Sequence, residues 1–138
     1  MTERYLWIAG TLPLLILGTL HLIYTFFSNK FSSTNKSLEE EMKISFPVIT
    51  RKITMWKAWI GFNASHSIGA MFIGTVNLFI ATFHFSILQN SIFYLLLNIV
   101  TILFYLWLAK KYWFSIPLIG VTISSCCFVT AGIIILVK

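Results

Sequence analysis

Two histidines lie deep inside long apolar stretches of the sequence, His21 in the stretch 5–27 and His66 in the stretch 55–82. Ionisable side chains are costly in lipid, so they usually face a bundle interior or a functional site. Two imidazoles could transfer protons to a lipophilic substrate, hold a b-type haem as axial ligands, or bind a transition metal. The alternative is structural, with each imidazole bonding a hydroxyl, amide or carbonyl across helices.

Further polar side chains accompany the histidines. At about 100° per residue, Trp59, Asn63, His66 and Asn77 fall within roughly 60° of one another on a helix. Asn98 and Tyr105 share a face of the next apolar stretch, and Ser124 to Cys127 lie in the last one. We therefore expect a central pocket with His21 and His66 as catalytic candidates. The ligand-binding candidates are Trp59, Asn63, Ser65, Asn77, Asn98 and Tyr105.

Several kinds of site are excluded by what the apolar stretches lack. All four acidic residues, Glu3 and Glu39 to Glu41, lie outside them, which disfavours a carboxylate pair, a carboxylate-rich metal site and an exporter built around an intramembrane glutamate. The only cysteines, Cys126 and Cys127, are adjacent, so neither a CxxC redox pair nor a cysteine zinc site is available. No metal site is expected apart from the haem alternative.

The composition is that of a membrane protein. Hydrophobic residues make up 58% of the 138 residues and charged residues 10%, with a mean hydropathy of +0.87. Soluble domains carry about a quarter charged residues. The net charge of +6 does not indicate nucleic acid, because the basic residues flank the apolar stretches.

Four stretches are long enough to cross a bilayer, which needs about 20 apolar residues in a helix. They are residues 5–27, 55–82, 91–109 and 116–137, and Pro13 is expected to kink the first. The fold class predicted is therefore all-α, a four-helix transmembrane bundle forming one domain over residues 1–138. The polar connection 28–54 is expected to hold a short surface helix, 38–46, that ends before Pro47. The first stretch is too long for the apolar region of a cleavable signal peptide.

The lengths of these stretches also predict where the histidines lie. At 1.5 Å per residue, His21 is about 9 Å inside the boundary at Phe27, and His66 is about 16 Å past Met55. Because the second helix runs back in the opposite direction, we expect the two imidazoles at neighbouring depths.

The distribution of basic residues predicts the orientation. The first and third connections hold eight of them: Lys30, Lys36, Lys43, Arg51, Lys52, Lys57, Lys110 and Lys111. The opposite side has only Arg4 and Lys138. The positive-inside rule then places these connections in the cytoplasm and both termini outside, for a multi-pass protein of the inner (plasma) membrane.

A second face of the helix that carries His66 has small residues at every fourth position, namely Gly61, Ser65 and Gly69. This small-xxx-small pattern allows close approach of another helix. It predicts packing within the bundle or a homo-oligomer formed through this face.

Two segments resemble a known group of proteins. The segment Trp56 to Gly69, WKAWIGFNASHSIG, and the segment Gly18 to Leu22, GTLHL, are similar to those of an uncharacterised family of small four-span bacterial integral membrane proteins. The resemblance implies a bacterial four-helix membrane protein and marks His21, Trp59, Asn63, Ser65 and His66. It implies no particular substrate.

The function predicted is binding of a lipophilic small molecule in a pocket that opens toward the cytoplasmic leaflet. His21 and His66 would supply proton or hydrogen-bond chemistry, Asn63 would orient the ligand, and Trp59 would form an apolar wall. An enzyme with these groups would catalyse proton transfer or isomerisation rather than hydrolysis. The alternatives are a haem b electron-transfer protein using His21 and His66, a structural or accessory subunit, and a small dimeric transporter.

Overall fold

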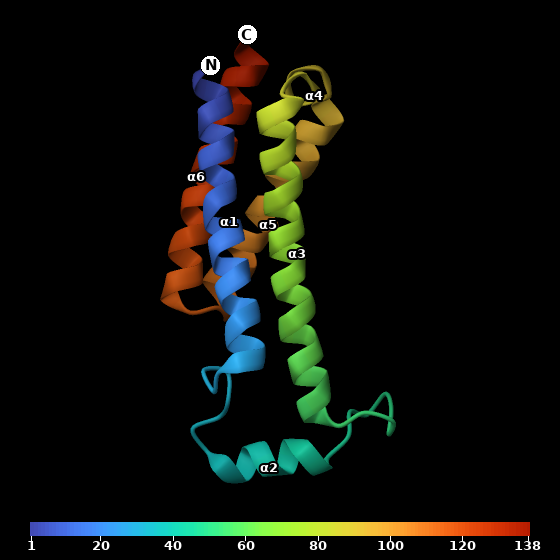
Figure 1. Cartoon of the computed structure of the whole chain (residues 1–138). Coiled ribbons are helices and arrows are strands. Elements are labelled where there is room, and N and C mark those ends of the chain that lie inside the picture. Colours follow the sequence, from blue (N-terminus) through green and yellow to red (C-terminus); the bar gives the residue numbers. More distant parts are fainter. The chain divides into compact units, whose positions relative to one another are not determined.

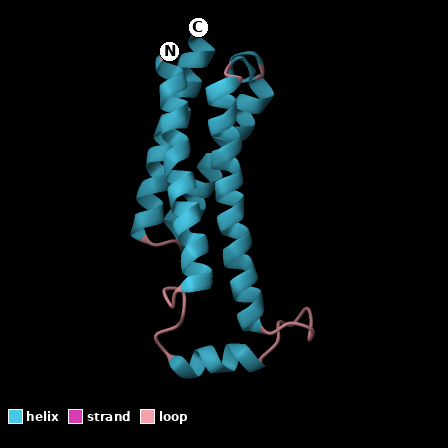
Figure 2. Ribbon diagram, viewed as in Figure 1, coloured by secondary structure: helices cyan, strands magenta, loops and turns pink.

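The computed structural model describes residues 1–138, and α-helices are its only regular secondary structure (Figures 1 and 2). Its six helices are α1 (Thr2–Phe27), α2 (Lys36–Ile44), α3 (Met55–Phe83), α4 (Ser86–Asn90), α5 (Ile92–Tyr112) and α6 (Ser115–Val137). Four of them, α1, α3, α5 and α6, are long and apolar enough to cross a membrane. The all-α class and the four long apolar helices are confirmed, and the chain is a multi-pass membrane protein.

The helix boundaries differ in small ways from those predicted, and side-chain caps account for two of the differences. Asn35 accepts a hydrogen bond from the backbone N–H of Ser37 at 3.1 Å, so α2 begins at Lys36. Ser91 caps α5 in the same way by accepting from the N–H of Tyr94 at 3.2 Å. The connection before Ser91 holds the short helix α4, which the sequence reading did not predict.

The chain divides into two compact units, and α1 and α3 contribute residues to both. Unit 1 comprises residues 1–17 and 70–138, and unit 2 comprises residues 18–69. Unit 1 therefore contains α4, α5 and α6 with parts of α1 and α3, whereas unit 2 contains the remaining parts of α1 and α3 together with α2.

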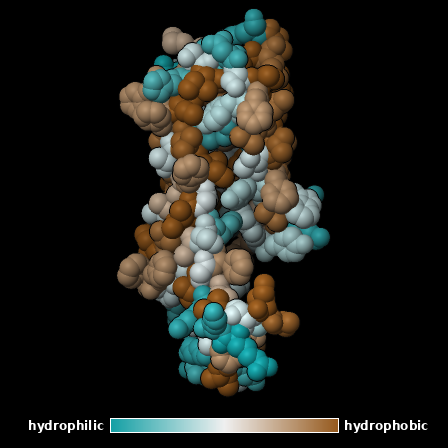
Figure 3. Space-filling view, turned by 90° about the vertical axis from the view of Figure 1, so that its right-hand side faces the viewer, coloured by the Kyte–Doolittle hydropathy of each residue, from teal (hydrophilic) through white to brown (hydrophobic).

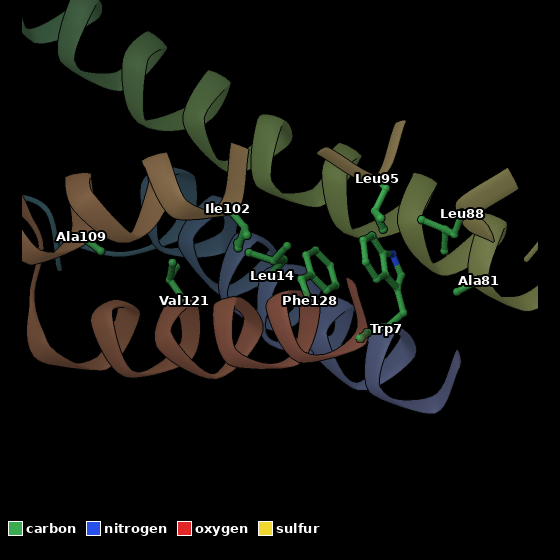
Figure 4. Close-up of a cluster of buried hydrophobic side chains, with 10 residues drawn as sticks. Trp7, Leu14, Ala81, Leu88, Leu95, Ile102, Ala109, Val121 and Phe128 are labelled. Carbon is green, nitrogen blue, oxygen red and sulfur yellow. The ribbon is translucent and has the colours of Figure 1, made fainter. Parts of the chain in front are cut away.

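Unit 1 holds the hydrophobic core, which all of its helices supply (Figure 4). The buried residues of this hydrophobic core are Trp7, Leu14, Ala81, Leu88, Leu95, Ile102, Ala109, Val121, Phe128 and Ala131. The Trp7 and Phe128 rings stack with centroids 4.5 Å apart and 12° between their planes. Gly10 allows this contact, because a Cβ there would lie 2.6 Å from the Phe128 ring.

A buried polar network joins three helices of unit 1. Trp7 Nε1 donates to Asn77 Oδ1 at 2.9 Å, and Asn77 Nδ2 donates to Asn98 Oδ1 at 2.6 Å. The two amides also donate to the backbone carbonyls of Ile73 and Tyr94. Because each amide oxygen and nitrogen has a partner, the network can lie in the core without an unpaired polar group.

Charged groups at the chain ends of unit 1 are also paired. Glu3 accepts from Lys138 Nζ at 2.7 Å and from the amino group of Met1 at 3.0 Å. Arg4 donates to the backbone carbonyls of Ala81 and Thr82 in the last turn of α3. A cation at this position satisfies orphan carbonyls and interacts favourably with the helix dipole.

Unit 2 is an α1–α3 hairpin joined through α2, which runs across the ends of the two helical arms (Figure 1). Its buried residues are only Gly18, Thr25 and Ser67, and α2 has none. Thr25 and Ser67 donate their hydroxyls to carbonyls of their own helices. Unit 2 therefore lacks a large apolar core of its own.

Candidate functional site

Unit 2 brings the two intramembrane histidines into contact. The His21 ring from α1 and the His66 ring from α3 have centroids 5.4 Å apart and are edge to face, with 71° between their planes. The neighbouring depths predicted from the sequence are thus confirmed for this pair. His21 and His66 are both partly buried.

Asn63 fixes the orientation of His21. Its Nδ2 donates to the backbone carbonyl of Trp59 at 2.8 Å, so its Oδ1 is the atom that faces the imidazole. His21 Nε2 lies 3.0 Å from this oxygen. Because the amide oxygen can only accept, Nε2 of His21 carries the proton. In the neutral ring, Nδ1 is then the acceptor nitrogen.

A phenylalanine from the polar connection covers His21. The Phe31 ring lies against the imidazole with centroids 4.3 Å apart and 32° between the planes. Trp59 Nε1 donates to the backbone carbonyl of Phe31 at 3.2 Å. This hydrogen bond joins Phe31, the residue that covers His21, to helix α3.

The connection before Phe31 folds into a tight turn. Ser28 Oγ donates to the carbonyl of Tyr24 and accepts from the N–H of Lys30, whose ammonium lies 4.1 Å from the centre of the Tyr24 ring. The N–H of Ser32 donates to the carbonyl of Asn29 at 3.0 Å. These local bonds return the chain toward α1. Sequence reasoning missed Phe31, because nothing in a polar connection indicates which of its aromatic residues folds back.

Ser65 and Gly61 lie on an exposed face of α3. Ser65 Oγ donates to the carbonyl of Phe62 at 3.0 Å. Both small residues are exposed, and a Cβ placed on Gly61 would meet nothing within 4 Å. Within this chain, Gly61 is therefore not a helix-packing contact.

Three of the predicted ligand-binding residues belong to unit 1. Asn77 and Asn98 are 2% and 8% exposed and take part in the network with Trp7. Tyr105 is half-buried, and its ring lies edge to face against Trp113 with centroids 5.9 Å apart. The asparagines act there as interhelical hydrogen bonders. The histidine cluster that unit 2 assembles thus consists of His21, Asn63, His66, Trp59 and Phe31.

Unit 1 also has an open apolar groove of about 440 Å³ between α1 and α6. Residues including Leu12, Pro13, Ile16, Ile119 and Gly120 line it. It contains none of the predicted site residues and offers no polar side chain to a ligand.

The arrangement of the two imidazoles does not fit a haem as it stands. Axial histidines bind the iron through ring nitrogens on opposite faces of a macrocycle. Here the rings meet edge to face, and Nε2 of His21 is bonded to Asn63. To hold a haem, the rings would have to separate and His21 would have to leave Asn63.

Comparisons with protein-family models, with curated proteins and with solved structures found no match to the chain.

Proposed function

We propose that this membrane protein binds a lipophilic small molecule, and that the polar head of this ligand contacts the cluster of His21, Asn63 and His66. The observation that supports the proposal best is the 3.0 Å contact between His21 Nε2 and Asn63 Oδ1. This contact assigns the proton of His21 to Nε2, and the His66 ring lies next to the His21 ring. A carbonyl or hydroxyl head group, as in a quinone or a lipid, would complement these donors and acceptors.

The aromatic residues around the cluster suit an apolar ligand body. Phe31 lies over His21, and Trp59 is 40% exposed on the same helix as Asn63. Binding sites for small molecules typically combine apolar and aromatic walls with a few placed polar groups. If the bound molecule reacts, the groups present favour proton transfer or isomerisation, because imidazoles near neutral pH both donate and accept protons.

The test is ligand retention by matched histidine variants. The native protein, His21→Ala, His66→Ala and His84→Ala would be purified in lipid nanodiscs, and each would be titrated with decylubiquinone as the probe. Mass spectrometry would identify co-purified lipophiles. We expect both intramembrane variants to lose the probe and any co-purified species. His84 is exposed outside the spans, so its variant should bind as the native protein does. Equal binding by all four proteins would contradict the proposal.

A second proposal concerns assembly through the face that carries Gly61 and Ser65. The open space around Gly61 supports it, because another helix could approach the α3 backbone there. In this role the chain would be an accessory subunit or a dimeric transporter. Gly61→Ile should then lower self-association or partner capture while His66→Ala leaves it unchanged. If Gly61→Ile leaves self-association and partner capture unchanged, assembly through this face is contradicted.

A further inference from the structure

The connection between α2 and α3 contains a tight turn whose tip is apolar. The N–H of Thr50 donates to the carbonyl of Pro47 at 3.2 Å, which leaves Val48 and Ile49 as the two central residues. Such positions usually hold Gly, Asn, Asp or Ser. Val48 is nevertheless fully exposed here, and Ile49 is 92% exposed. The turn thus exposes two branched aliphatic side chains at positions where polar residues are usual.

The residues on either side extend this apolar surface. Ile44, Phe46 and Ile53 are also exposed. Together with Val48 and Ile49 they form what we call the apolar turn, five large apolar side chains within ten residues. Exposed clusters of this kind mark sites that contact a membrane or another protein. Figure 3 shows brown apolar side chains beside teal hydrophilic ones in the region of α2 and its connections.

The position of the turn in the chain favours the bilayer as its partner. Ile53 lies two residues before Met55, where the apolar helix α3 begins. The N–H of Met55 donates to the carbonyl of Ser45 at 3.0 Å, which closes the segment into a loop at the start of that helix. In Figure 1 this loop projects to the side of α2 and α3. At about 1.5 Å per residue, the 29 residues of α3 extend over roughly 44 Å, about the thickness of a bilayer with its head groups. A loop at the start of this helix is therefore within reach of the head-group region.

The charges beside the apolar turn favour anionic lipid. Arg51, Lys52 and Lys57 are exposed, and no acidic residue follows Glu41 in the chain. Lys43 is the exception among the nearby cations, because hydrogen bonds to Glu40 and Glu39 neutralise it locally and raise its pKa. Apolar side chains combined with unpaired basic ones are typical of segments that lie in an anionic bilayer interface.

We propose that the apolar turn inserts into the head-group region of the bilayer and that Arg51, Lys52 and Lys57 contact the phosphates of anionic lipids. The segment 44–53 then attaches the long connection to the membrane at a point between the spanning helices α1 and α3. This attachment does not depend on the ligand proposed for the histidine cluster.

A fluorescent label at the turn tests the proposal. In a background with Cys126→Ser and Cys127→Ser, NBD would be attached at Val48→Cys and, as the matched control, at Ser37→Cys, an exposed position of the same connection. Nanodiscs would contain phosphatidylcholine alone or phosphatidylcholine with phosphatidylglycerol. We expect the Val48 label to show blue-shifted emission, quenching by shallow doxyl lipids and slow reduction by dithionite. The Ser37 label should show none of these effects.

The contribution of charge is tested separately. Phosphatidylglycerol should slow dithionite reduction of the Val48 label further, and Arg51→Gln with Lys52→Gln should abolish that additional protection. Reduction of both labels at the same rate in both lipid mixtures would overturn the insertion. If phosphatidylglycerol and the glutamine substitutions do not change the rate at which dithionite reduces the Val48 label, the anionic-lipid contacts are overturned. Protection that appears only in discs holding two protein molecules would replace the bilayer with a second copy as the partner.

Discussion

The imidazole of His21 and the amide of Asn63 are joined across 42 residues of sequence by a contact of 3.0 Å between Nε2 and Oδ1. The amide oxygen faces the ring because the amide nitrogen is bonded to the Trp59 carbonyl. One hydrogen bond inside α3 therefore determines which nitrogen of a histidine on α1 carries a proton.

The first prediction concerns this tautomer. In the native protein the ¹⁵N spectrum of His21 should show a protonated Nε2. In Asn63→Leu, which has a similar volume and no acceptor, the Nδ1-protonated form should become populated. Solid-state NMR of the histidine-labelled protein in lipid provides the measurement. His84 is the internal reference, because its signals should be the same in both proteins. A native spectrum with the proton of neutral His21 on Nδ1 would refute the assignment.

The second prediction concerns the bond from Trp59 to the Phe31 carbonyl. Trp59→Phe keeps an aromatic ring but removes the donor, and loss of a hydrogen bond costs about 1 kcal/mol. Backbone amides of residues 28–35 should then exchange hydrogen roughly fivefold faster, since about 1.4 kcal/mol corresponds to a factor of ten. The control is Trp56→Phe, because the Trp56 ring lies beside Lys43 instead. Equal exchange in the two variants would show that the bond does not hold the connection.

The third prediction concerns the core network. Asn77→Ala removes the oxygen that accepts from Trp7 Nε1 and the nitrogen that donates to Asn98 Oδ1. The buried indole N–H of Trp7 and the amide oxygen of Asn98 are then left unpaired. We expect a loss of about 1–3 kcal/mol in the free energy of unfolding, measured by denaturant titration in mixed micelles. Thr122→Val is the matched control, because its hydroxyl is exposed and donates only to the carbonyl of Leu118. A loss no larger than that of the control would mean that the network is dispensable.

The fourth prediction compares two glycines on spanning helices. A methyl group at Gly10 would lie 2.6 Å from Phe128, whose ring is stacked on Trp7 and has little freedom to move. Gly10→Ala should therefore destabilise the protein by about 1–3 kcal/mol. Gly61→Ala adds the same methyl group in open space, and it should leave stability unchanged or raise it by up to about 1 kcal/mol. Thermal unfolding of both variants gives the comparison, and similar midpoints would contradict it.

The fifth prediction concerns orientation. The basic residues of the connection 28–54 should hold it in the cytoplasm. A periplasmic alkaline phosphatase fused after Lys138 should therefore be active. The same enzyme inserted at Thr34, within the first connection, should be inactive. Activity at Thr34 and none after Lys138 would reverse the proposed orientation.

The spanning helices could be predicted from sequence because a bilayer imposes a length on apolar segments. The stretch 55–82 corresponds to α3 within one residue at its C-terminal end. Helix α4 was missed because a helix of five residues has no periodicity to detect. Its boundary with α5 depends on one capping hydroxyl, that of Ser91.

The candidate site could be predicted only in part. Helical spacing placed Asn63 and His66 on one face, and depth placed His21 opposite them. The same spacing grouped Asn77 with them, although Asn77 bonds Trp7 and Asn98 in the core of unit 1. Spacing describes one helix and carries no information about which neighbour each turn of that helix meets. The contact between Phe31 and His21 could not be predicted for the same reason, because Phe31 belongs to a turn in the connection and not to a helix.

The small number of buried residues in unit 2 has a practical consequence for handling the protein. Only Gly18, Thr25 and Ser67 are enclosed there, so the chain by itself leaves the histidines only partly surrounded, and in the membrane lipid can complete their apolar surroundings. A detergent that strips this lipid would replace part of the wall around the imidazoles and could wash out whatever rests against them. Extraction in polymer-bounded native membrane patches is therefore the preparation in which an endogenous ligand should be sought.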